Sequence, residues 1–290
     1  MFSGLATALI TPMRADGSID EAGLRQLVRF QEDKGVRALV PCGSTGESAT
    51  LDHEEHLQAI SIVVDEARKA KVIAGTGSNS TSEAIHLSKN AQDLGADALL
   101  SVTPYYNRPT PAGIKGHFKA ISDAVDIPII VYNIPSRTGS NISSATMLEL
   151  AQLPNVAGVK EASGDINQIS RIIAGAPKDF VVLSGDDAMT LPTMALGARG
   201  VISVASNIVP ELMLQLVGGM LDGRLEDARA TNRRLLPLFS ALFLETNPQP
   251  VKTAVGLMGL PAGPLRMPLC EMSPEHLESL KKVLAEYDLI

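Results

Sequence analysis

The chain has 290 residues and a formal net charge of −7, with hydrophobic residues at 45% and charged residues at 20%. These ordinary globular values exclude a disordered or fibrous chain, and the acidic balance argues against nucleic acid as the main partner. The length suits one α/β barrel of about 250 residues with an appendage.

Short apolar runs alternate along the chain with longer amphipathic segments. The runs predicted as strands are residues 4–11, 38–41, 71–75, 98–102, 128–133, 156–160, 180–184 and 200–204. The predicted helices that follow them are residues 20–34, 52–70, 81–94, 111–125, 143–153, 166–176, 187–196 and 209–221.

These strands read as continuous apolar runs, which is typical of a parallel sheet covered on both faces. Eight strand–helix units predict a closed (β/α)8 TIM barrel. A doubly wound open sheet is the alternative. It normally uses fewer units, and no GxGxxG fingerprint follows the first strand.

After the eighth unit the sequence predicts only helices, at residues 225–243, 250–259 and 273–286, with proline-rich joints at 247–250 and 261–268. We therefore expect a catalytic barrel over residues 1–223 and a C-terminal helical domain over 224–290. No low-complexity linker separates them, so the helices should pack on the barrel.

The two cysteines, Cys42 and Cys270, have neither CxxC nor CxxH spacing, so we expect no disulfide scaffold and no structural zinc. Residues 1–12 lack the features of a leader peptide, and no apolar run reaches about 18 residues. These features predict an untargeted, soluble, cytoplasmic protein without a membrane partner.

The active site of a barrel of this kind lies at the carboxyl ends of its strands. The run at residues 156–162 places Lys160 at such an end. A lysine held where water is scarce loses its proton easily, and its amine can then attack a carbonyl. The alternative is a strand-end lysine whose charged head extends to solvent.

A Gly-Ser-Thr-Gly turn at residues 43–46 follows the second strand. It lacks the lysine and the spacing of a phosphate-binding loop. Its backbone N–H groups and the hydroxyls of Ser44 and Thr45 suit a small carboxylate. Alternatively, the glycines only make the turn and the hydroxyls only cap the next helix.

Three of the four tyrosines, Tyr105, Tyr106 and Tyr132, fall at predicted strand ends. Tyr132, Thr45 and Tyr106 could form a proton relay beside Lys160, although packing at the barrel mouth would also explain the rings. Arg137 could hold a second carboxylate, or be an idle loop arginine.

Together these residues describe Schiff-base chemistry on a 2-keto acid. The carbonyl carbon condenses with Lys160, loss of an α-proton gives an enamine, and the enamine attacks an aldehyde. The protonated imine is the electron sink, so we expect no metal and no cofactor.

The motifs at residues 43–47, 105–107, 132–139, 158–161 and 247–252 resemble the dihydrodipicolinate synthase and N-acetylneuraminate lyase superfamily across essentially the whole chain. Residues 136–139 and 105–109 are similar to the synthase branch, which implies condensation of pyruvate with L-aspartate 4-semialdehyde to 4-hydroxy-tetrahydrodipicolinate in lysine and diaminopimelate synthesis. Ser44 stands where many synthases carry threonine, and a lyase acting on N-acetylneuraminate or a 2-keto-3-deoxy sugar acid is the alternative.

By position, the resemblance implies that Lys160 forms the Schiff base and that Tyr132, Thr45 and Tyr106 relay protons. The implied substrate-binding residues are Ser44, Thr45, Arg137 and Ile202. The family is usually a homotetramer, a dimer of dimers in which the tyrosine matching Tyr106 reaches into the neighbouring subunit's site.

A second site is implied at positions where lysine-inhibited synthases bind L-lysine: Ser48, Ala49, His53, His56, Asn79, Glu83 and Tyr105. The two histidines are one residue short of HExxH spacing, and no third zinc ligand suggests itself. The alternative is helix capping, by Asp52 with Glu55 and by Ser80 with Glu83. A non-catalytic amino-acid-binding relative is a further alternative.

Overall fold

The structure, a computed structural model, describes residues 3–290. Eight parallel strands pair in sequence order, and the last returns to the first, so the sheet closes into a barrel. The strands are β1 (Gly4–Ala8), β2 (Ala38–Val40), β3 (Lys71–Gly75), β4 (Ala98–Val102), β5 (Ile129–Asn133), β6 (Val156–Glu161), β7 (Val181–Ser184) and β8 (Gly200–Ser203). The predicted (β/α)8 barrel is confirmed.

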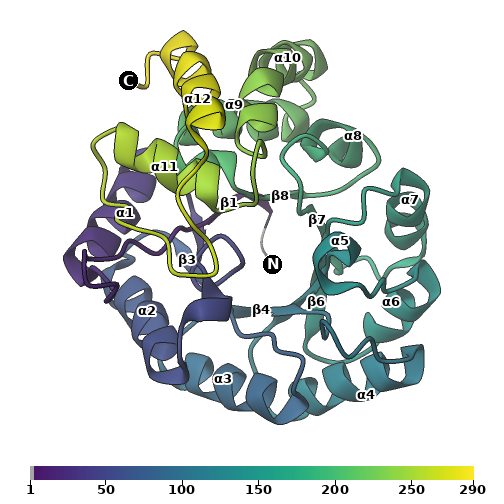
Figure 1. The fold of residues 1–290 in the computed structure, drawn as a ribbon. Coiled ribbons are helices and arrows are strands. Elements are labelled where there is room, and N and C mark those ends of the chain that lie inside the picture. The colour runs from purple at the N-terminus through teal and green to yellow at the C-terminus, as the bar shows by residue number, and fades with distance from the viewer. Residues whose placement is uncertain (1–2) are drawn as a thin grey trace.

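Helices form a ring around the strands (Figure 1). They are α1 (Glu21–Asp33), α2 (His53–Glu66), α3 (Thr81–Asp93), α4 (Pro111–Ser122), α6 (Ser144–Leu150), α7 (Ile166–Gly175), α8 (Thr190–Ala195) and α9 (Pro210–Leu221). Two 3-10 turns, η1 (Ser48–Thr50) and η2 (Ala205–Asn207), and a short helix, α5 (Pro135–Thr138), follow strands β2, β8 and β5. All three lie at the carboxyl ends of strands.

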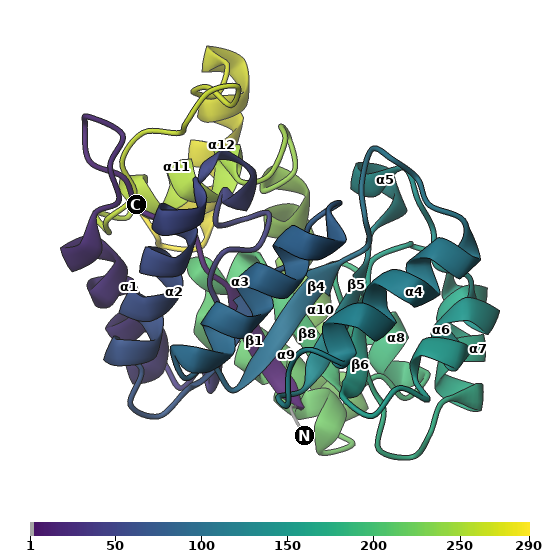
Figure 2. The ribbon, with the colours of Figure 1, turned by 90° about the horizontal axis from the view of Figure 1, so that it is seen from below.

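The C-terminal helices are α10 (Leu225–Ala241), α11 (Gln249–Leu257) and α12 (Pro274–Glu286). Leu235, Val251 and Leu280 from these helices belong to the same buried cluster as Leu5 of β1. The helices therefore pack on the barrel, as expected. A view from the side places the N-terminus at one end of the barrel and α5 and α11 at the other (Figure 2).

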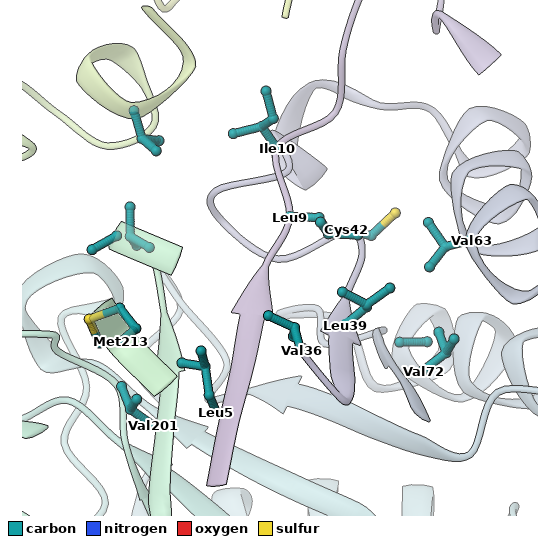
Figure 3. Packing of buried hydrophobic residues seen from close by; sticks show 14 of the residues in the cluster. Leu5, Leu9, Ile10, Val36, Leu39, Cys42, Val63, Val72, Val201 and Met213 are labelled. Carbon is teal, nitrogen blue, oxygen red and sulfur yellow. The ribbon is translucent and has the colours of Figure 1, made fainter. Parts of the chain in front are cut away.

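The core has two layers because the strands are covered on both faces. Alternate strand residues such as Leu39 and Val72 point outward, where they pack with Val63 of α2 (Figure 3). The remaining strand residues fill the barrel interior, among them Ile73, Tyr132 and Leu183. Burial on both faces explains why the strands read as continuous apolar runs.

Helix ends depart from the predictions where side chains are used elsewhere. The helix predicted from residue 187 begins only at Thr190, because the Asp187 carboxylate accepts the backbone N–H groups of Val204 and Ala205 instead. Asp52 and Glu55 form the predicted capping box of α2. The capping predicted for Ser80 and Glu83 is wrong, since the Ser80 side chain caps nothing.

Among residues 3–290, no helix combines the length and the apolar character that crossing a bilayer requires. Residues 1 and 2, part of the segment in which we expect no leader peptide, lie outside the described range.

Candidate active site

Lys160 stands in β6, between Tyr132 of β5 and Leu183 of β7 in the strand register. Its side chain points into the barrel, its residue is only 6% exposed, and its Nζ lies 4.3 Å from the centre of the Tyr132 ring. The head therefore does not extend to solvent. Gly185 leaves room for the lysine stem, because a Cβ there would come within 3.1 Å of Lys160 Cγ and 3.2 Å of its Cε.

Burial lowers the pKa of Lys160 to about 8, against the opposing attraction of the Asp187 carboxylate, and the positive charge of Arg137 lowers it further. At pH 7 a lysine of this pKa is neutral in about a tenth of molecules, whereas an ordinary lysine is neutral in well under about one in a thousand. The amine is thus poised for nucleophilic attack.

A small cavity of about 50 Å³ adjoins this amine. Its lining contains Ser44, Thr45, Tyr132, Arg137 and Lys160. The structure thus brings together five of the predicted site residues, which come from three separate segments of the sequence. The turn at residues 43–46 therefore borders the same cavity as the lysine.

The turn itself is tightly packed. Thr45 is 3% exposed, and a Cβ on Gly46 would lie 3.1 Å from both Cys42 N and Leu9 O. Glycine at position 46 therefore lets the turn press against the barrel wall, which fixes the hydroxyls of residues 44 and 45 beside the lysine.

A wider hollow of about 700 Å³ lies outside this cavity. Arg137 borders both spaces, and its Nη2 donates to the Asn247 carbonyl oxygen at 2.8 Å. The arginine is therefore held between the lysine and the entrance, where it can meet the carboxylate of a second substrate.

Two predicted residues are placed differently from the rest. Tyr106 is 90% exposed, with φ 68°, and within a single chain it does not reach the cavity. Ile202 is buried in the barrel interior on β8, and Val204 rather than Ile202 lines the cavity. The roles expected of both residues stay predictions.

The burial of Tyr132 raises the pKa of its phenol. The group therefore stays protonated near neutral pH, and it can act as a proton donor beside Lys160.

Three functional candidates carry no role in the sequence analysis. Asn247 and Phe243, from the segment between α10 and α11, line the cavity with Lys160. Asp187, whose pKa burial raises to about 6, acts on the charge of Lys160. The Asn247 motif was visible in the sequence, but only the fold shows what the side chain contacts.

The opposite end of the barrel holds a hollow of about 600 Å³ that includes Lys71 and Asp97. Lys71 Nζ lies 2.7 Å from Asp97 Oδ1, and this hydrogen bond raises the pKa of the lysine. A charged, paired amine is no nucleophile, so the chemistry belongs at the Lys160 end.

A second pocket, of about 330 Å³, lies beside η1 and α2. It is lined by six of the seven residues predicted to bind lysine: Ser48, Ala49, His53, His56, Glu83 and Tyr105. The seventh, Asn79, lies next to the lining residue Ser78, and its carbonyl oxygen accepts from Asn107. The predicted set is thus gathered in one place.

Two carboxylates line this second pocket, and Glu83 is the one that is not paired with Lys252. Its carboxylate accepts a hydrogen bond from Ser78 and lies 2.5 Å from His53 Nε2, and these contacts lower its pKa. This use of the side chain explains why it does not cap α3. Across residues 3–290, no cluster of His, Cys, Asp or Glu could hold a metal ion.

A parallel barrel whose buried lysine of lowered pKa stands among a phenol and a hydroxyl-rich turn has the fold and site of a Schiff-base aldolase. Within that class, the chain belongs to the dihydrodipicolinate synthetase family, whose model matches residues 1–287.

A similar protein, the 4-hydroxy-tetrahydrodipicolinate synthase of Methanothrix thermoacetophila, is 50% identical over 287 residues, which cover 99% of this chain and 97% of that protein. The chloride-inhibited dihydrodipicolinate synthase of Acinetobacter baumannii, solved with pyruvate, is 41% identical with a TM-score of 0.98, and the alignment covers 100% of both chains. The corresponding enzyme of Cyanidioschyzon merolae, solved with lysine bound, is 40% identical with a TM-score of 0.97, covering 100% of this chain and 99% of that one.

Proposed function

We propose that this chain condenses pyruvate with L-aspartate 4-semialdehyde to 4-hydroxy-tetrahydrodipicolinate, in the synthesis of lysine and diaminopimelate. The observation that carries the proposal is Lys160, a buried amine with a pKa near 8 that shares one cavity with Ser44, Thr45 and Tyr132. The names of the relatives support the same activity.

In the first step the pyruvate carboxylate lies on the Ser44–Thr45 turn, with its keto carbon toward Lys160. The neutral amine attacks that carbon, and a proton passes from nitrogen to oxygen to give a carbinolamine. Uptake of one further proton, supplied by Tyr132, releases water and leaves a protonated imine.

In the second step the imine nitrogen draws electrons from the adjacent C–H bond. The methyl group of the bound pyruvate loses a proton to the relay, and an enamine forms. Its carbon attacks the aldehyde carbon of the semialdehyde, whose carboxylate Arg137 holds, and the new alkoxide takes a proton back.

In the last step the amino group of the semialdehyde, now part of the same molecule, attacks the imine carbon. A ring forms, and a proton passes from the attacking nitrogen to the Lys160 nitrogen. The carbon–nitrogen bond to Lys160 then breaks and the lysine leaves as a neutral amine, while the ring nitrogen forms a double bond to the same carbon and returns its remaining proton to the relay. No redox change occurs in any step, so the sequence balances without a further reactant.

The proton relay is proposed to include Tyr106 from a neighbouring copy of the chain. It is 90% exposed and does not line the cavity of its own chain, and both facts support a role across an interface. We accordingly propose a homotetramer built as a dimer of dimers. The free cysteines Cys42 and Cys270 suit a reducing cytoplasm.

We further propose that L-lysine inhibits the enzyme at the second pocket. Glu83 supplies a carboxylate for the ligand's ammonium, and His53 and Ser48 supply further polar contacts. The C. merolae enzyme was solved with lysine bound, which supports the proposal.

The test is a steady-state assay of purified protein with pyruvate and L-aspartate 4-semialdehyde, with pyruvate and N-acetylmannosamine as the matched alternative pair. We expect turnover with the semialdehyde and none with the sugar. Turnover of pyruvate with N-acetylmannosamine but not with the semialdehyde would assign the lyase function instead.

A further inference from the structure

Asn247 lies between α10 and α11, and it is only 5% exposed. Its Nδ2 donates to Thr45 Oγ1 at 3.0 Å, and its backbone oxygen accepts from Arg137 Nη2 at 2.8 Å. Asn247 is thus hydrogen-bonded both to the turn at residues 43–46 and to Arg137, the residue proposed to hold the carboxylate of the semialdehyde.

The hydrogen bond from Asn247 to Thr45 restricts the direction in which the Thr45 hydroxyl can donate its own proton. A hydroxyl has one proton to donate, and in Thr45 the oxygen is occupied as an acceptor by the amide of Asn247. The Thr45 proton must therefore point to another acceptor. The cavity offers the Tyr132 phenol and the position of the pyruvate carboxylate as candidates.

The side-chain oxygen of Asn247 has no hydrogen-bond partner among the described residues. Asn247 Oδ1 is buried and accepts no hydrogen bond from the described part of the protein, a state that costs free energy unless a partner arrives. Asn247 lines both the cavity with Lys160 and the outer hollow with Arg137. The residue that carries this unpaired acceptor therefore borders the space that substrates would fill.

The substrate chemistry supplies such a partner. The semialdehyde carries its carboxylate and its amino group on the same carbon, so an acceptor beside the carboxylate clamp lies within reach of the amino group. Asn247 is bonded directly to Arg137 and meets this condition.

We propose that Asn247 serves both halves of the reaction. Its Nδ2 aligns the Thr45 hydroxyl for proton transfer, which makes it a positioning residue for the pyruvate half. Its Oδ1 accepts the amino N–H of the amino aldehyde and orients that group. The inference rests on the proposed function.

Two variants separate the two halves. Asn247→Asp keeps acceptor oxygens but cannot donate to Thr45, whereas Asn247→Leu removes donor and acceptor without adding charge. We expect kcat to fall roughly 10- to 100-fold in both, while KM for the semialdehyde rises roughly 10-fold only in Asn247→Leu. The added carboxylate would raise the pKa of Lys160, so the variants are compared well above pH 9, where the neutral amine predominates.

A double-mutant cycle tests the route through Thr45. In a Thr45→Val background, Asn247→Leu should cause no further loss of kcat, since the hydroxyl that it orients is gone. Borohydride trapping of the pyruvate adduct should stay at the wild-type extent in Asn247→Leu.

Asn155→Leu is the matched control. This half-buried amide donates to Ser122 O and Val125 O near the amino ends of the strands, away from Lys160. It should lower Tm with kcat unchanged, which separates loss of stability from loss of alignment.

Unchanged kcat in both Asn247 variants, or losses that multiply with Thr45→Val, would overturn the positioning role. An unchanged KM for the semialdehyde in Asn247→Leu would overturn the amino contact. The proposed function is judged separately, by wild-type turnover, because all effects of the variants are ratios to the wild type.

Discussion

Glu47 and Lys252 form a fully enclosed ion pair, in which Lys252 Nζ lies 2.5 Å from Glu47 Oε1. The Lys252 side chain is 1% exposed and the Glu47 side chain 0%. The second carboxylate oxygen, Oε2, accepts the backbone N–H of Arg266 at 3.0 Å. Glu47 closes the turn that carries Ser44 and Thr45, and Lys252 belongs to α11. The pair therefore ties the C-terminal helices to the substrate turn.

Removal of one partner of this pair should destabilise the protein strongly. Lys252→Met leaves the Glu47 carboxylate buried without its cation, and we expect a loss of about 3–5 kcal/mol in the free energy of unfolding. Glu47→Leu with Lys252→Met should recover part of it. Urea unfolding at pH 7 measures both.

Lys119→Met, which breaks an exposed pair with Asp123, is the control and should cost less than about 1 kcal/mol. Equal costs for the two lysines would contradict the enclosed geometry.

Formation of the pyruvate adduct should rise with pH. The reactive form of Lys160 is the neutral amine, and burial lowers its pKa to about 8. Each unit of pH below 8 therefore cuts the neutral fraction about tenfold, and above about pH 9 the rate should level off. Stopped-flow measurement of adduct formation from pH 6 to 10 gives the midpoint. A midpoint near 10.5 would show that the amine is not desolvated.

Tyr132→Phe should slow the chemistry without harming the fold. The ring stays in its packed position, and only the phenol oxygen is lost, so we expect Tm to remain within a few degrees. Loss of a general acid costs roughly 10²–10⁴-fold in kcat. Tyr287→Phe is the control, because it removes a hydroxyl that follows α12 and donates to Arg234 O of α10. A Tyr132→Phe enzyme with more than about half the wild-type kcat would remove the phenol from the relay.

L-Lysine should inhibit through the second pocket. With saturating lysine the initial rate should fall, and Glu83→Gln should weaken inhibition by roughly 10- to 100-fold because the ammonium loses its carboxylate. The uninhibited rate should be unchanged, since Glu83 does not border the Lys160 cavity. Initial rates over a lysine series give the inhibition constant for wild type, Glu83→Gln and the surface control Glu149→Gln. Rates that ignore lysine altogether would refute the regulatory proposal.

Much of the fold could be predicted because it depends on local patterns. The strands are apolar over their whole length since both faces are buried, and a lysine that ends such a run, Lys160, was identifiable without coordinates. The turn at residues 43–46 and the tyrosines could also be located, since parallel strands bring their carboxyl ends to one side.

The sequence could not predict which side chains form hydrogen bonds or ion pairs with residues far away in the chain. Thr45 and Asn247 are 202 residues apart, and Glu47 and Lys252 are 205 apart. Ser80 and Glu83 have the spacing of a capping box, yet Glu83 turns to Ser78 and His53 instead. The short helix α5, at Pro135–Thr138, was missed because a single turn carries no periodicity.

The most direct measurement is mass spectrometry of the protein after borohydride reduction in the presence of pyruvate, with the modified peptide sequenced. The account predicts one pyruvate-derived adduct per chain, located on Lys160, and no adduct in Lys160→Ala. An adduct on another lysine, or an unmodified wild-type protein that still turns over pyruvate and the semialdehyde, would contradict it.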